Sequence, residues 1–181
     1  MKTPNNKQGF TIIEVVLVLA IAGLIFLMVF VALPALQRSQ RDTQRRNDMA
    51  RVATALINYQ TNQGNSSTKL PGASSCTGNS VPTNPSSYSG DNAACKFIAT
   101  YMNASGATSN DFRDPDGTLY NLDISDSSTA LSVSNVDHKV YIRTGKKCGS
   151  TEGTLTDANG STGFAVLYKL EGAGTYCADN E

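Results

Sequence analysis

The sequence predicts an α+β protein in which one long N-terminal helix packs on a small antiparallel β-sheet head that is held by disulfides. Three observations lead to this prediction. The nineteen residues from Val15 to Leu33 contain no charged side chain. Good helix formers, mainly Ala, Arg, Gln and Leu, continue from Ala35 to Gln63. The remainder of the chain holds the four cysteines and several short β-prone segments separated by turn residues.

The apolar run is long enough to cross a membrane. At a rise of about 1.5 Å per residue, Val15 to Leu33 spans roughly the hydrocarbon core of a bilayer. Seventeen residues from Phe10 to Leu33 are Phe, Ile, Val or Leu. Each favours insertion by roughly 0.3–0.6 kcal/mol, whereas a central acid costs roughly 2.5–3.5 kcal/mol. The run therefore inserts even with Glu14 at its start, and a partner that neutralises Glu14 would recover part of its cost.

The helix is expected to continue past the apolar run. We predict one helix from about Thr11 to about Asn62, bent gently at Pro34, which lacks an amide donor. Gly64 is a plausible C-cap. An apolar stripe at helical spacing indicates that the second half packs on the head. The stripe consists of Met49, Val52, Ala53, Leu56 and Gln60, with Tyr59 beside it.

The head begins with a polar loop from Asn65 to Gly90, rich in Ser, Asn, Thr, Gly and Pro. A short helix is expected from about Asn92 to Asn103, with Asp91 as its cap. The residues from Glu171 to Gly174 form the turn between the last two strands. The expected strands are Thr118 to Ile124, Ala130 to Ser134, Lys139 to Thr144, Phe164 to Leu170 and Thr175 to Ala178.

Charge is unevenly distributed, although the net charge is zero. Residues 35–63 hold five Arg against two Asp, and residues 64–181 hold eight Lys or Arg against twelve Asp or Glu. The mildly acidic head argues against nucleic-acid binding. The arginines behind the apolar run favour a cytoplasmic C-terminal side. We expect them to pair with acids of adjacent stems or with lipid phosphates, or to lie on a solvated helix face.

The four cysteines favour an oxidising exterior, and this outweighs the charge bias. Pairing of sequence neighbours, Cys76–Cys95 and Cys148–Cys177, is the preferred connectivity, and the other two connectivities stay open. Each bridge would stabilise by roughly 3 kcal/mol. No C-x-x-C pair is present and His138 is the single histidine, so a zinc site is not expected.

The start of the chain carries a family resemblance. Gly9-Phe10-Thr11-Ile12-Ile13-Glu14, followed by the apolar run, resembles the class III signal of type IV pilins and pseudopilins. The resemblance implies that a prepilin peptidase cleaves after Gly9 and that Phe10 becomes the N-methylated terminus. It also implies that Glu14 pairs with the free amine of a neighbouring subunit during fibre assembly.

This resemblance completes the expected domain organisation. Residues 1–9 would be the leader, 10–34 the membrane-spanning assembly half of the helix, and 35–63 its amphipathic half. Residues 64–181 would be the head, with a loop and short helix over 64–117 and the sheet over 118–181. A cleaved secretory signal peptide or an ordinary membrane anchor with an incidental Glu14 are the alternatives.

A second segment bears on function. Asp114-Pro115-Asp116-Gly117 is a turn entering a strand, and it resembles an Asp-Pro-x-Gly segment of the major pseudopilins of type II secretion. Asp114, Asp116 and Asp123 are a weak calcium candidate, because their spacing lacks the EF-hand order. Neither a G-x-S-x-G motif nor a P-loop is present, so no enzymatic activity and no cofactor is expected.

The resemblance therefore implies a structural subunit of a type IV pilus that polymerises with itself and other pilins. It would be a single-pass cytoplasmic membrane protein before assembly and part of an extracellular fibre afterwards. Its partners would be the prepilin peptidase, the inner-membrane assembly platform and the membrane. The alternative within the family is a pseudopilin of a type II secretion or competence system. From another class, the head could be a ligand-binding adhesin on an ordinary anchor.

Overall fold

The computed structural model describes residues 9–62, 70–77, 92–102, 112–126, 138–160, 162–172 and 174–181. It confirms the α+β class, with a long N-terminal helix, a β-sheet head and two disulfides. The chain divides into two compact units, Met1–Ser39 and Gln40–Glu181.

The first unit contains the apolar part of helix α1 (Ile12–Asn62), which begins one residue after the expected start and includes Pro34. Its large apolar side chains, from Ile12 to Leu36, are exposed on all sides of the helix. By length and composition, α1 can cross a membrane, and it is the one such helix among the described residues. A helix that is apolar all round needs lipid or other helices around it.

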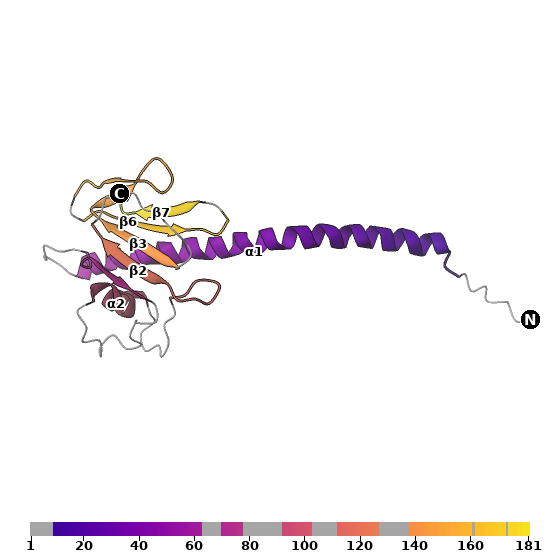
Figure 1. Ribbon diagram of the computed structural model, residues 1–181, viewed down its shortest axis with the longest axis horizontal. Helices are drawn as coiled ribbons and strands as arrows, with labels where there is room; N and C mark the ends of the chain where they lie inside the picture. Colours follow the sequence, from indigo (N-terminus) through magenta and orange to yellow (C-terminus); the bar gives the residue numbers. More distant parts are fainter. Residues whose placement is uncertain are drawn as a thin grey trace, which may run out of the picture. The chain divides into compact units, whose positions relative to one another are not determined.

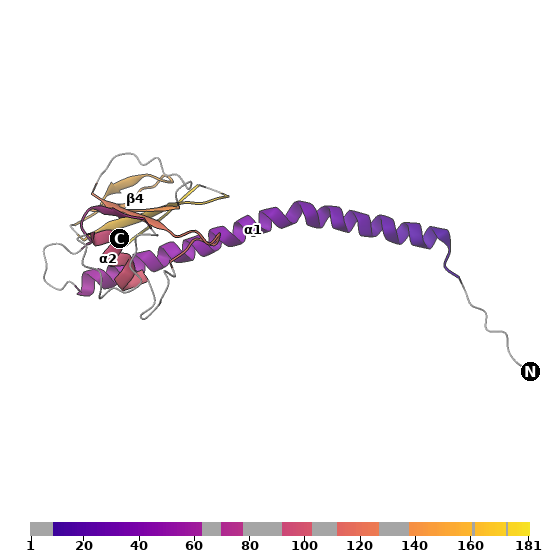
Figure 2. The ribbon, with the colours of Figure 1, turned by 60° about the horizontal axis from the view of Figure 1, so that its bottom comes forward.

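The second unit is built on the C-terminal half of α1, which lies along one face of the sheet (Figures 1 and 2). Met49, Val52 and Leu56 are fully buried, as the apolar stripe predicted, and Ala55 is buried beside them. They pack in one core with the inward side chains of the sheet and the short helical segment. These include Phe97, Ile98, Leu122, Ile124, Val140, Ile142, Phe164, Val166 and Tyr168.

The main sheet has five strands in the order β1-β2-β3-β6-β7. All its pairs are antiparallel except β2 with β3, which are parallel, so the antiparallel expectation is wrong for that pair. Residues 126–138 separate these two strands, and a connection of a dozen residues is what a parallel return requires. The strands are β1 (Ser74–Cys76), β2 (Asn121–Ser125), β3 (Lys139–Thr144), β6 (Phe164–Lys169) and β7 (Thr175–Asp179).

Several strands differ from the expectation. Strand β1 lies in the segment expected to be loop, and β4 (Lys146–Cys148) and β5 (Leu155–Asp157) form an unexpected second sheet. Strand β2 begins at Asn121 rather than Thr118, because the Thr118 carbonyl accepts a hydrogen bond from the Asp114 amide and closes a turn. The expected strand from Ala130 to Ser134 and the expected cap Gly64 lie outside the described residues.

The expected short helix is two consecutive pieces, α2 (Ala93–Phe97) and a π-helical turn, η3 (Ile98–Met102). The N-cap is Asn92 rather than Asp91, which lies outside the described residues. The Asn92 backbone is extended, and its Oδ1 accepts a hydrogen bond from the Cys95 amide at 3.2 Å. Asn92 thus satisfies one of the free amides of the first helical turn.

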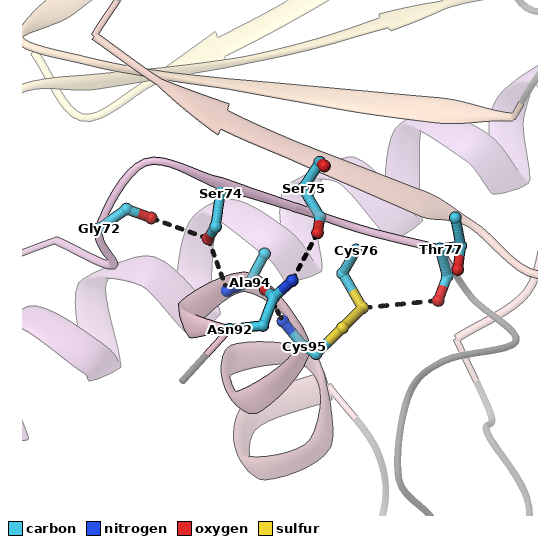
Figure 3. The surroundings of a disulfide bond; sticks show 8 residues. All are labelled: Gly72, Ser74, Ser75, Cys76, Thr77, Asn92, Ala94 and Cys95. Carbon is cyan, nitrogen blue, oxygen red and sulfur yellow. Dashed lines mark hydrogen bonds between the residues drawn. A yellow bond between two sulfur atoms is a disulfide. The ribbon is translucent and has the colours of Figure 1, made fainter. Parts of the chain in front are cut away.

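Two disulfides join neighbouring elements of the head. Cys76–Cys95 links β1 to α2, and Figure 3 shows the hydrogen bonds around it. There the Asn92 side-chain amide donates to the Ser75 carbonyl at 2.7 Å. Cys148–Cys177 links the second sheet to edge strand β7. Both bridges therefore fix short peripheral elements onto the main sheet.

The packing of α1 on the sheet can be measured with two adjacent residues. Leu56→Ala leaves a cavity in the core, and we expect the free energy of unfolding to fall by about 2–5 kcal/mol. Ile57→Ala is the matched control, because Ile57 is 46% exposed, and its change should be clearly smaller. Chemical denaturation of the detergent-solubilised chain, followed by tyrosine fluorescence, gives both values. Equal losses in the two variants would contradict the described packing.

Candidate functional site

At the start of α1, the Glu14 side chain contacts Thr11, the residue that directly precedes the helix. The backbone amide and the hydroxyl of Thr11 both donate to Oε2 of Glu14, each at 2.8 Å. The hydrogen bond from the Thr11 backbone amide is one half of a capping box, in which the side chain of the third helical residue accepts from the N-cap amide. The carboxylate also lies where the helix dipole favours negative charge. Because both bonds go to Oε2, Oε1 has no hydrogen-bond partner among the described residues.

The two residues expected to be processed precede this cap. Gly9 and Phe10 lie before α1 and are exposed, with Phe10 91% accessible. An exposed segment that precedes a helix is accessible to a peptidase. Residues 1–8 of the expected leader lie outside the described residues. The structure thus brings Gly9, Phe10 and Glu14 together in one short stretch that ends in a capped helix.

A second set of polar groups joins α1 to the head, and all of its members except Glu171 are buried. We call it the helix–head cluster, and it consists of Asp42, Arg45, Asp114, Tyr168 and Glu171. The Arg45 guanidinium donates to both oxygens of Asp114, at 2.7 and 2.8 Å. The Tyr168 hydroxyl donates to the same carboxylate at 2.9 Å. This paired, charge-assisted geometry joins α1 to the Asp114 turn and to strand β6.

The same cluster holds the turn between β6 and β7. The Asp42 carboxylate accepts hydrogen bonds from the backbone amides of Glu171 and Gly172, at 2.9 and 2.8 Å. The Glu171 carboxylate in turn accepts two bonds from Arg41, at 2.8 and 2.7 Å. A Cβ at position 172 would approach Asp42 to 3.0 Å, so glycine allows this close contact. One turn of α1 therefore binds both the backbone and the side chain of the hairpin.

The cluster shifts the pKa values of its members in opposite directions. Burial raises the pKa of Asp114, but the hydrogen bonds from Arg45, the Asp116 amide and Tyr168 outweigh it, so the pKa lies below its ordinary value. The hydrogen bond to Asp114 raises the pKa of Arg45 in spite of burial. Burial, followed by the nearby charge of Asp114, raises the pKa of Tyr168. Asp114 and Arg45 are therefore an ion pair at neutral pH.

Two of the arginines that were expected to pair with other copies or with lipid, or to lie on a solvated helix face, form ion pairs within the chain instead. Arg45 is 5% exposed and pairs within its own chain, as does Arg41. The sequence contained a signal for this, because Arg45 extends the buried stripe of Met49, Val52 and Leu56 by one helical turn. Its side chain must therefore face the head, and a buried guanidinium requires a carboxylate.

The weak calcium candidate is only partly assembled. Asp114 and Asp116 lie together, and with His138 they place ligand atoms within 4.8 Å of one another. Asp123 is not in this group, and its carboxylate lies 3.5 Å from the Arg143 guanidinium. Since Asp114 is already neutralised by Arg45, the group offers little net negative charge to a cation.

Comparison with protein families matches residues 4–30 to the prokaryotic N-terminal methylation motif. The match covers Gly9, Phe10 and Glu14 as well as most of the apolar run. The chain therefore carries the class III signal that is typical of type IV pilins and pseudopilins. In this N-terminal part the chain is similar to type IV pilins and pseudopilins, which are typically structural rather than enzymatic proteins. No curated protein and no solved structure matches the chain.

The buried pair predicts a specific pH dependence. Folding lowers the pKa of Asp114, so its carboxylate stabilises the folded state above the unfolded pKa of about 3.9. That contribution is lost as the pH falls through the lower folded value. Asp114→Ala removes the partner of a buried cation and should cost about 3–5 kcal/mol at pH 7. Denaturation of wild type and variant between pH 2 and 7 gives the difference in their free energies of unfolding. This difference should shrink as the pH falls below the unfolded pKa of Asp114.

Asp126→Ala is the control, because Asp126 is exposed and should change stability by no more than about 0.5 kcal/mol. Burial and, to a smaller extent, the charge of Asp114 raise the pKa of Asp48, which therefore contributes with the opposite sign. Because Asp114→Ala removes that charge, the Asp48 contribution cancels only in part between wild type and variant. A gap between wild type and Asp114→Ala that stays constant down to pH 2 would contradict the assigned ion pair.

Proposed function

We propose that this chain is a structural subunit of a type IV pilus. In this proposal the chain is stored in the membrane, cleaved after Gly9, N-methylated at Phe10 and polymerised through its N-terminal helix. The observation that supports it most is the match of residues 4–30 to the methylation motif, in which the exposed Gly9 and Phe10 lead into an apolar helix. Residues 1–9 are then the leader, 10–34 the assembly half of the helix, 35–63 its amphipathic half, and 64–181 the head.

Assembly exchanges lipid for neighbouring helices. The exposed apolar side chains between Val15 and Leu33 pack on the same segments of other copies, which forms the fibre core. Glu14 is the polar group that this exchange must accommodate. Its Oε2 is occupied by Thr11, and its Oε1 remains to accept a hydrogen bond from the Phe10 amine of another copy. A charge-assisted bond of this kind lowers the cost of burying both groups and sets the register between subunits.

The partners follow from this sequence of events. The prepilin peptidase processes the exposed Gly9–Phe10 bond, and an inner-membrane assembly platform moves the subunit from the lipid into the fibre. Other copies of the chain and other pilins provide the neighbouring helices. The subunit is a single-pass membrane protein before assembly and an extracellular fibre component afterwards. In the fibre it would support adhesion, motility or DNA uptake.

A pseudopilin of a type II secretion or competence system is the second candidate. The observation that favours it is the Asp114-Pro115-Asp116-Gly117 turn, which the Asp114 carbonyl closes by accepting from the Gly117 amide at 2.8 Å. Gly117 has a φ of 91°, which favours glycine over any other residue. Electron microscopy of the native cell separates the candidates, because long surface fibres containing this chain favour the pilus.

Processing gives the first test of this proposal. The mature protein, purified from its native host, should lack residues 1–9 and begin at Phe10 with the mass of one added methyl group. Intact-mass spectrometry with N-terminal sequencing measures both changes. A Gly9→Val variant should retain its leader, because the peptidase then meets a branched side chain at the cleaved bond. A mature wild-type chain that begins at any other residue would rule out the proposed processing.

Replacing the carboxylate tests the assembly step. Glu14→Val should insert into the membrane as well as wild type, since it makes the segment more apolar, but its incorporation into fibres should fall at least tenfold. Glu14→Gln keeps an oxygen that can cap Thr11 but carries no charge, and it should fail in the same way. Thr11→Ala is the control, because it removes one hydrogen bond and leaves the charge. Membrane fractionation and quantitation of sheared fibres measure both steps, and normal fibres from Glu14→Val would refute the role.

A further inference from the structure

A shallow groove lies within the second unit, between α1 and the π-helical turn η3. Its volume is about 360 Å³, at the lower end of the range for small-molecule sites. The wall formed by η3 carries Tyr101 and Met102. The wall formed by α1 carries residues at helical spacing, namely Asn47, Ala50, Arg51, Thr54, Ala55 and Asn58.

The groove combines unused hydrogen-bonding groups with small apolar surfaces. Asn47 and Asn58 are exposed to solvent, and their side-chain amides have no hydrogen-bond partner among the described residues. Thr54 donates its hydroxyl to the Ala50 carbonyl at 2.9 Å and keeps its acceptor sites. Beside these polar groups Ala50 is exposed and Tyr101 is half-buried, whereas Met102 is 3% exposed. A ligand here meets both donors and acceptors within a few ångströms of apolar carbon.

The charge of the groove is balanced. Arg51 is the one ionisable group on the α1 side, and its Nη1 lies 3.4 Å from an Asp48 carboxylate oxygen. Its Nη2 donates to the Met102 carbonyl at 3.4 Å, so the guanidinium bridges the two walls. An anion would therefore find little net attraction. A purely apolar ligand would strip water from the asparagine amides without replacing those hydrogen bonds.

The wall opposite α1 is fixed before any ligand arrives. Tyr101 packs on Phe97 and Tyr59, with ring centroids 5.6 and 5.5 Å apart. The helix that precedes η3 is held by the Cys76–Cys95 disulfide and by the hydrogen bonds shown in Figure 3. Turns of π-helix are rare and occur often at functional sites. A preformed wall reduces the ordering cost of binding.

From these observations we propose that the groove binds a neutral saccharide unit. A sugar ring presents hydroxyl groups that match the amides of Asn47 and Asn58 and the Thr54 hydroxyl. Its C–H faces match the methyl group of Ala50 and the half-buried ring of Tyr101. The sugar carries no charge, which is consistent with a groove in which the charge of Arg51 is already offset by Asp48. Binding by the groove does not require polymerisation, so this inference and the proposed pilus function can fail separately.

The test uses the full-length chain in a zwitterionic detergent without a sugar headgroup. Methyl glycosides of glucose, galactose and N-acetylglucosamine are the probes, and saturation-transfer NMR with calorimetric titration measures binding. At least one glycoside should bind wild type. Asn58→Ala should weaken that binding about tenfold, as expected for one lost hydrogen bond. Ala50→Phe, which fills the groove, should abolish it.

Gln44→Ala is the matched control, since Gln44 is exposed on α1 outside the groove and its variant should bind as wild type does. Thermal denaturation of each variant verifies that loss of binding is not loss of folding. The proposal is wrong if none of the three glycosides binds, or if Asn58→Ala and Gln44→Ala bind alike. It is also wrong if a cysteine at position 58 crosslinks efficiently to another copy in fibres, because the groove would then be a subunit interface.

Discussion

The buried pair of Arg45 and Asp114 is the interaction on which the head depends. A guanidinium that is 5% exposed must be neutralised, and the carboxylate that neutralises it comes from a turn 69 residues away. Tyr168 bonds to the same carboxylate, and Asp42, one helical turn earlier, binds the turn after β6. The direction of α1 across the sheet is therefore fixed by polar groups with defined partners, while the apolar core supplies most of the burial.

The helix and strands whose apolar residues recur at a regular spacing could be predicted from the sequence, and the short strands could not. The helix bounds and strands β3, β6 and β7 were predicted to within a residue or two, because 3.6- and 2-residue patterns set them locally. Strands β1 and β4 are three residues long and depend on partners far away in the chain. The parallel pairing of β2 with β3 carries no local signal either, since it depends on how the intervening chain returns.

The two parts of the candidate site differ in the same way. Gly9, Phe10 and Glu14 are contiguous, so the sequence alone predicts their motif, and the family comparison matches it. The helix–head cluster joins residues from three separate segments, and the stripe that contains Arg45 indicated only that it faces the head. The groove beside η3 could not be predicted, because its outer wall depends on a π-helical turn where the sequence indicated an ordinary helix. Sequence reasoning thus predicts sites that lie within one segment better than sites that several segments share.

The placement of the disulfides has a mechanical consequence. Cys76–Cys95 and Cys148–Cys177 join β1 to α2 and β4 to β7, and neither includes a residue of α1. Apart from the backbone that continues from Asn62 toward β1, a pulling force applied along the helix therefore reaches the sheet through noncovalent contacts. Ion pairs and apolar packing that run along a helix are loaded together in shear, so they resist until many break at once. Under tension the sheet would keep its covalent links, and the surface between α1 and the sheet would yield first.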